Sequence, residues 1–171
     1  MARNPRPARR VLVACYRFRT LAVVELTEGE RPFVLKHCIR GLRRNLARAV
    51  AFVLRDANTS RPRLIVADNA LLADELRKTI CAVPIQTITI ATAKEVLLPA
   101  EHRPNHHDLY HHLLRQHPHL RRYVTVIPST GHIAESERWR TVVLLAVALG
   151  LAAQQQARGG NHRRPTGRPV A

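Results

Sequence analysis

The length and charge of the chain limit the class of protein it can be. The chain has 171 residues, 46% of them hydrophobic, and a formal net charge of +16. This length fits one ordinary domain with a hydrophobic core. The positive charge attracts polyanions, of which nucleic acid is the commonest. An anionic membrane surface or an acidic protein would also complement this charge. The longest apolar run, 142–153, is too short for a membrane span of about 20 residues, so we expect no membrane-spanning or secreted protein.

Hydrophobic periodicity predicts alternating strands and helices. We expect strands at 10–16, 20–26 and 33–39 joined by short turns, then a helix at 41–57, a strand at 63–67, a helix at 70–79 and a strand at 85–91. Further helices are expected at 104–116 and 135–155, with 121–127 either a strand or an extended linker. The domain is predicted to cover 10–156, between disordered basic tails at 1–9 and 157–171.

The three cysteines indicate the redox setting. Cys15, Cys38 and Cys81 are an odd and scattered set, so they suggest neither a disulfide framework nor a paired metal clip. Cys15 and Cys38 fall in predicted strands, where buried free thiols are common. We therefore expect a reducing, cytoplasmic location.

This order of elements resembles the ribonuclease H-like fold, an α/β fold with a mixed five-stranded sheet flanked by helices. Residues 11–25, VLVACYRFRTLAVVE, resemble the opening of RuvC-type Holliday-junction resolvases, with Arg19 where that family carries a basic residue. Residues 63–68 resemble the fourth strand with an acid at its carboxyl end, and 144–149 resemble the closing helix. The resemblance covers 10–91 in outline and 132–155 more loosely.

The resemblance implies a two-metal nuclease, but several of its acids are replaced here. In that family carboxylates hold two divalent ions that activate water and stabilise the leaving oxygen. Cys15 stands at the position of the first-strand acid, and 140–143 in the last helix read RTVV where the family carries acids. Asp68 fits its place, and Glu135 and Glu137 lie a turn or more early; these three are the catalytic candidates, with Asp68 and Glu135 as ligands of Mg²⁺ or Mn²⁺.

Each of these acids also has a structural alternative. Asp68 can cap the helix that begins at Ala70, and Glu135 and Glu137 can stabilise the first turn of a helix. A neutral Cys15 cannot replace a carboxylate for Mg²⁺, because thiolates prefer softer metals. We therefore predict that catalysis has been lost.

Histidines form a second candidate site. His107 and His111 lie four residues apart on one predicted helix face, a spacing that can chelate Zn²⁺. No Glu follows His107 to complete an HExxH motif, and a polar surface helix explains the same spacing. A further alternative is pH-sensitive contact with phosphate. No GxSxG, Walker or GxGxxG motif occurs.

Arginines form clusters suited to phosphate, because guanidinium groups bind phosphate oxygens in a bidentate way. The predicted nucleic-acid contacts are Arg17, Arg19, Arg40, Arg43, Arg44, Arg48, Arg121 and Arg122. Tyr16, Phe18 and Tyr123 lie among them and either stack on exposed bases or belong to the core. Such clusters predict backbone contact rather than sequence-specific contact with bases.

The sequence thus predicts a catalytically degenerate, nucleic-acid-binding protein, with DNA favoured over RNA. The first alternative is a metal-dependent, structure-selective endonuclease. The second is a structural subunit of a larger nucleoprotein complex. A homodimer is possible through the apolar face of 139–149, although core packing explains that face equally well.

Overall fold

The computed structural model describes residues 9–27, 33–42, 46–99, 106–122 and 138–162. These residues form a mixed five-stranded sheet in the order β3-β2-β1-β4-β5, flanked by helices. The strands are β1 (Arg10–Arg17), β2 (Thr20–Thr27), β3 (Val34–Ile39), β4 (Leu64–Ala67) and β5 (Ile85–Thr87). Strand β2 is antiparallel to both β1 and β3, whereas β4 is parallel to β1 and β5. The predicted meander and the predicted sheet are confirmed.

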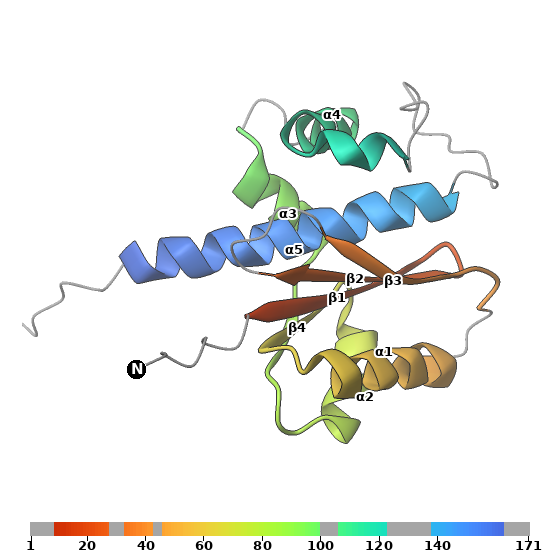
Figure 1. Cartoon of the computed structure of the whole chain (residues 1–171). Coiled ribbons are helices and arrows are strands. Elements are labelled where there is room, and N and C mark those ends of the chain that lie inside the picture. Colours follow the sequence, from red (N-terminus) through yellow and green to blue (C-terminus); the bar gives the residue numbers. More distant parts are fainter. Residues whose placement is uncertain (1–8, 28–32, 43–45, 100–105, 123–137, 163–171) are drawn as a thin grey trace, which may run out of the picture.

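Helices cover both faces of this sheet (Figure 1). Helices α1 (Leu46–Ser60) and α2 (Ala70–Thr79) lie on one face, and α5 (Arg138–His162) crosses the other. Helices α3 (Ile90–Leu97) and α4 (His106–Gln116) lie beyond α5 on its side of the sheet, and the short 3-10 helix η2 (Pro118–Arg122) follows α4. The longest helix therefore sits in the middle of the molecule.

The alternation of side chains along β1 builds two cores. Val11, Val13 and Cys15 face α5, and Leu12 and Ala14 face α1 and α2; all five are buried. This is the two-residue period of a strand whose faces are both covered. The residues 142–149 of α5 are likewise buried in the first of these cores, so core packing accounts for the apolar face that a dimer interface would otherwise use.

Several element boundaries differ from the sequence prediction; α1, for example, ends at Ser60 rather than at residue 57, and residues 121–122 lie in η2 rather than in a strand or extended linker. Strand β5 ends at Thr87 rather than at residue 91, because Thr89 caps the unpredicted helix α3 by accepting a hydrogen bond from the Thr92 backbone N–H. In the described residues α1 begins at Leu46, and Gly41, the predicted first residue, has a φ of +73° that does not belong to a helix. Helix α5 continues to His162, past residue 157, where a tail was predicted to begin.

Parts of the predicted tails and linker, 1–8, 123–127 and 163–171, lie outside the described residues. Within the described chain, α5 included, no helix is both long enough and apolar enough to cross a membrane.

Candidate nucleic-acid interface

Four strands end at the same edge of the sheet. Strands β1, β4 and β5 are parallel, and β3 runs in the direction of β1 because both are antiparallel to β2. Their carboxyl ends therefore meet at one edge, which also holds the β1–β2 turn and the start of α5 at the right of Figure 1. In open α/β sheets this edge is the usual place for a binding site.

Asp68 follows β4 at this edge, where the sequence analysis placed it. Its Oδ1 accepts hydrogen bonds from the Tyr16 backbone N–H at 3.0 Å and from Asn69 Nδ2 at 3.1 Å. Its Oδ2 forms an ion pair with Arg17 Nε at 3.7 Å. Only 2% of the Asp68 side chain is exposed. Burial raises the pKa of Asp68, and the hydrogen bond from Tyr16 and the charge of Arg17 oppose this rise only in part.

The alternative role of Asp68 as a helix cap is wrong. Asn69 is the N-cap of α2, and its side chain accepts a hydrogen bond from the Leu72 backbone N–H at 2.8 Å. Asp68 instead joins β4 to β1, since its own N–H also donates to the Ala14 carbonyl. The carboxylate thus fastens the ends of two neighbouring strands together.

Cys15 lies beside Asp68, because Ala14 and Ala67 are register partners and each is followed by one of the two residues. The Cys15 side chain is fully buried. Burial raises the pKa of its thiol well above the usual value, and the neighbouring Asp68 carboxylate raises it further. The thiol is therefore kept protonated, and it offers neither a nucleophile nor a hard ligand.

These residues do not fit a Mg²⁺ or Mn²⁺ site. Hard cations need several oxygen ligands, yet both carboxylate oxygens of Asp68 already face protein donors, and the charge of Arg17 lies where a cation would be repelled. Within the described ranges no group of three or more His, Cys, Asp and Glu side chains is placed to hold a metal ion. Glu135 and Glu137, the other proposed ligands, lie outside the described residues.

Tyr110 of α4 is a buried side chain near this site that was not predicted from the sequence. The residue is 5% exposed and lies near Arg17 and near Cys15. Burial raises the pKa of Tyr110 to about 12, although the charge of Arg17 lowers the pKa of the phenol. The sequence pattern that could have indicated a buried Tyr110 is the apolar face of α4, on which Leu109, Leu113 and Leu114 are also buried. A single sequence does not show against which part of the sheet that face packs.

Four exposed arginines lie on the elements that meet at this edge. Arg17 ends β1, Arg19 lies in the following turn, Arg40 follows β3, and Arg48 lies in the first turn of α1. The Leu42 backbone N–H donates to the Arg19 carbonyl at 2.9 Å, so the β1–β2 turn and the segment leading to α1 are joined. All four arginine side chains are exposed. We call these four residues the basic edge.

Trp139 at the start of α5 extends the same region. The guanidinium carbons of Arg40 and Arg140 each lie 5.2 Å from the centre of the Trp139 ring. Cation–π attraction holds such pairs together. It ties the end of β3 to the beginning of α5 and fixes where the Arg40 charge lies.

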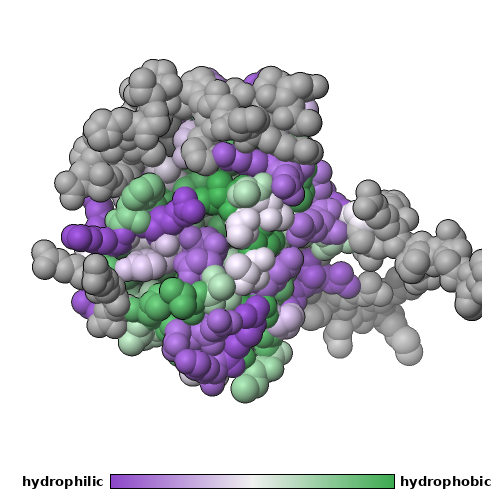
Figure 2. Space-filling view, turned by 180° about the vertical axis from the view of Figure 1, so that it is seen from behind, coloured by the Kyte–Doolittle hydropathy of each residue, from purple (hydrophilic) through white to green (hydrophobic). Residues whose placement is uncertain are grey.

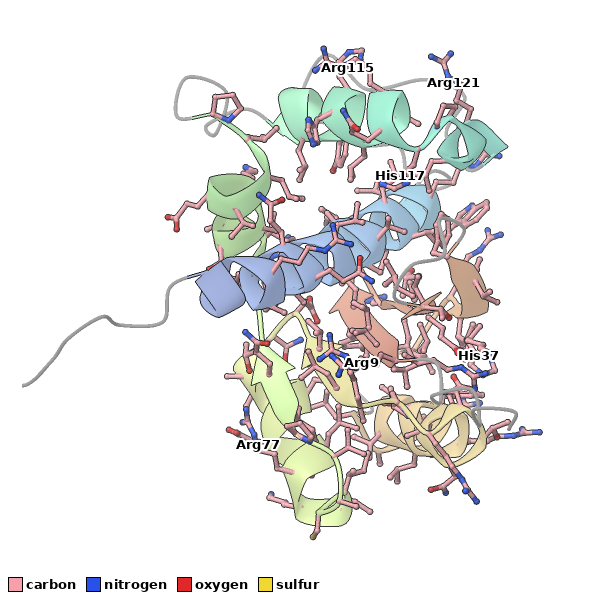
Figure 3. All side chains as sticks on the ribbon, turned by 60° about the vertical axis from the view of Figure 1, so that its left-hand side comes forward. Arg9, His37, Arg77, Arg115, His117 and Arg121 are labelled. Carbon is pink, nitrogen blue, oxygen red and sulfur yellow. The ribbon has the colours of Figure 1, made fainter. Side chains whose placement is uncertain are left out.

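The remaining predicted contacts are distributed differently. Figure 3 places Arg121 of η2 on the outer layer above α5, in the same layer as Arg115 of α4. His111 is exposed, and the side chain of His107, its predicted partner in binding zinc, is not among those that the structure describes. The same holds for the side chains of three predicted contacts, Arg43, Arg44 and Arg122. Figure 2 shows the opposite face, where hydrophilic and hydrophobic residues are interspersed over the described part of the surface.

Comparison with solved structures places this architecture among known folds. A Thermus thermophilus RuvC structure matches with a TM-score of 0.56 and 15% sequence identity, covering 88% of this chain and 96% of the other. Thermus thermophilus RuvC in complex with a Holliday-junction substrate matches with a TM-score of 0.52 and 15% identity, covering 89% and 96%. The chain has a RuvC-like fold. No protein-family model and no curated protein matches its sequence.

The RuvC-like fold confirms the resemblance drawn from residues 11–25 and 63–68, as far as the fold is concerned. At 15% identity the likeness concerns the arrangement of the backbone and does not extend to the chemistry of the site. That chemistry rests on Cys15, Asp68, Arg17 and Tyr110, as described above.

Proposed function

We propose that this RuvC-like domain binds nucleic acid through the basic edge and does not cleave it. The observation that carries the proposal is the closed environment of Asp68, whose carboxylate is bound by Tyr16, Asn69 and Arg17 beside the neutral thiol of Cys15. A catalytic carboxylate needs free oxygens and a second acid near it. In this proposal the basic edge has cations that contact phosphate, but it lacks the free carboxylates that would hold the metal ions needed to activate water.

DNA is the proposed ligand. A structural neighbour is a RuvC bound to a Holliday-junction substrate, which supports branched DNA as the first ligand to test. Arg19 in the β1–β2 turn and Arg48 in the first turn of α1 are both exposed, and neither is used in the ion pairs of the described residues. Contacts of this kind fix position on the backbone and carry no sequence preference.

Binding is tested by the salt dependence of affinity, measured by fluorescence anisotropy with a labelled four-way DNA junction. Each lost phosphate contact lowers the slope of log affinity against log salt by about 0.9. The double variant Arg19→Gln and Arg48→Gln is expected to lose affinity and slope together. Its matched control is Arg61→Gln with Arg63→Gln, which removes the same charge from two exposed residues just before β4, at the opposite edge.

Equal losses in the two double variants would show that total charge, rather than the basic edge, determines binding. Cleavage is tested on the four-way junction, a DNA duplex and an RNA–DNA hybrid with Mg²⁺ or Mn²⁺. No cleavage is expected from the wild type. Cleavage that disappears in Asp68→Asn would overturn the loss of catalysis, and the absence of both binding and cleavage would favour a structural subunit of a larger complex.

A further inference from the structure

One exposed aromatic side chain stands at the basic edge. Phe18 lies in the β1–β2 turn, between Arg17 and Arg19, and the residue is 48% exposed. The other large hydrophobic residues exposed in the described part of the chain are Val34 on β3 and Leu71 on α2. A single exposed apolar residue is ordinary, but Phe18 differs from the other two in its backbone conformation and in its cationic neighbours.

The backbone at Phe18 adopts a conformation that phenylalanine disfavours. Phe18 and Arg19 have φ values of 51° and 57°, and their flanking residues Arg17 and Thr20 are register partners. A two-residue turn with both φ values positive is the type I′ pattern, which favours Asn-Gly or Asp-Gly. Phenylalanine there is an outlier, and such outliers persist where the surroundings hold them in place.

The surroundings of this turn do hold it. The Thr20 hydroxyl donates to the Phe18 carbonyl at 3.3 Å, and the Arg19 carbonyl accepts from the Leu42 N–H at 2.9 Å. The Tyr16 hydroxyl donates in turn to the Leu42 carbonyl. The turn is therefore anchored to the segment after β3, and it presents Phe18 from a fixed position.

The structure also shows different environments for Tyr16 and Phe18, for which the sequence allowed either base stacking or a place in the core. Tyr16 is half-buried and uses its hydroxyl to fasten the turn, so its role is structural. Phe18 is presented between two exposed guanidinium groups. Alternation of aromatic and cationic side chains is how proteins bind single strands, with bases stacked on the rings and phosphates on the cations.

We propose that Phe18 stacks on an unpaired base, so that the ligand of the basic edge is nucleic acid with unstacked nucleotides rather than continuous duplex. In a continuous duplex both faces of each base are covered by its neighbours, and a ring on an anchored turn has no base face to contact. This inference rests on the proposed function and names the structural class of its ligand.

The test compares Phe18→Ala with Phe18→Trp on a labelled single strand, a forked duplex and a blunt duplex of the same sequence. Phe18→Ala is expected to weaken binding of the single strand and the fork by about fivefold or more, the usual effect of losing one stacked base. Its salt slope should equal that of the wild type, because no phosphate contact is removed. Phe18→Trp should retain the affinity, and blunt-duplex binding should not change.

Two further variants separate stacking from folding. Leu71→Ala removes another exposed apolar side chain, on α2, and should leave all three affinities unchanged. Phe18→Gly also lacks the ring but tolerates the positive φ, so it should melt at a higher temperature than Phe18→Ala and show the same loss of binding. A 2-aminopurine base in the single strand should be quenched by the wild type and not by either ring-deleted variant.

The outcomes distinguish this inference from the function on which it rests. Wild-type protein that binds none of the three ligands would overturn both. Salt-dependent binding that Phe18→Ala leaves unchanged would overturn the stacking role and leave the basic edge intact. A wild type that prefers the blunt duplex would overturn the ligand class.

Discussion

Arg17 and Asp68 form an ion pair across the carboxyl ends of β1 and β4, with 3.7 Å between Arg17 Nε and Asp68 Oδ2. The pair is asymmetric, because 45% of the arginine side chain is exposed and only 2% of the aspartate. The buried carboxylate thus has a protein cation beside it, while the arginine still reaches solvent at the basic edge. Arg17 therefore both pairs with the buried carboxylate of Asp68 and belongs to the surface proposed to bind phosphate.

The first prediction introduces a second acid at the site. Cys15→Asp places a second carboxylate beside Asp68, and without metal we expect it to lower the free energy of unfolding by roughly 3 kcal/mol, the cost of an uncompensated buried charge. Mn²⁺ should recover about 3 kcal/mol when present at about 100 times its dissociation constant. Wild type and Cys15→Ala should show no such response in urea titrations with and without Mn²⁺.

The double variant Cys15→Asp with Asp68→Asn is the control for this prediction. It retains one carboxylate, so the response to Mn²⁺ should largely disappear. A stabilisation of the wild type by Mn²⁺ that Asp68→Asn removes would contradict our view that the present residues do not fit a hard cation.

The second prediction concerns the pH dependence of stability. The pKa of Asp68 is raised from 3.8 in the folded protein, so its contribution is fully present below pH 3.8 and is lost as the pH rises through the raised value. Asp68→Asn keeps an acceptor for the Tyr16 N–H but cannot ionise. Relative to the wild type, this variant should therefore be more stable at pH 7 than at pH 3.8.

Urea unfolding of both proteins across this pH range measures the effect. Asp74→Asn is the matched control, because Asp74 is an exposed carboxylate paired with Arg77 on α2. A stability difference between Asp68→Asn and the wild type that stays constant with pH would show that the carboxyl group titrates alike in the folded and unfolded chains.

Most of the sheet could be predicted because its strands carry strong local patterns. The meander and β4 are short, apolar and separated by turn residues, and they appear where the sequence placed them. Strand β5 was extended too far because the alternation from Ile85 to Ile90 fits a strand, whereas the cap at Thr89 begins a helix. A capping hydroxyl three residues before its partner is a weak signal beside six residues of clear alternation.

The site was predicted only in part. The resemblance to RuvC-type resolvases predicted that Cys15 and Asp68 lie at the ends of two strands, and the structure shows that these strands are neighbours. The environment of their side chains depends on elements distant in sequence, such as the pairing of Arg17 with Asp68 and the position of Tyr110 near Cys15. The exposure of Phe18 likewise follows from the turn geometry, which composition does not reveal.

The third prediction concerns Tyr110 at alkaline pH. Its pKa rises from 10.0 to about 12 in the folded protein, so its contribution is present below pH 10 and is lost as the pH rises toward 12. The loss should be on the order of 2 kcal/mol of unfolding free energy. Tyr110→Phe should remove this part of the pH dependence, as measured by urea unfolding at several alkaline pH values.

Near-ultraviolet absorbance of tyrosinate provides an independent check. The difference between wild type and Tyr110→Phe should titrate near pH 12 in the folded protein and near pH 10 in urea. A difference that titrates near pH 10 in both would mean that α4 does not hold the phenol in the buried position beside Cys15.

The last prediction concerns how closely α5 approaches the sheet. A Cβ atom on Gly150 would lie 2.3 Å from Leu26 Cδ1 and 3.0 Å from Val13 Cγ2. Gly150→Ala should therefore lower the free energy of unfolding by about 1–3 kcal/mol, as overpacking does, although alanine favours helices. Gly159→Ala in the same helix meets nothing within 4 Å and should instead stabilise the protein by up to about 1 kcal/mol.

A compensating change tests the steric explanation directly. Leu26→Val shortens the side chain that the new Cβ would strike, so the double variant should lose less stability than the two single variants together. Chemical denaturation of the four proteins gives this coupling energy. Strict additivity would mean that Leu26 moves aside without cost, and that the close approach of α5 to β2 does not depend on Gly150.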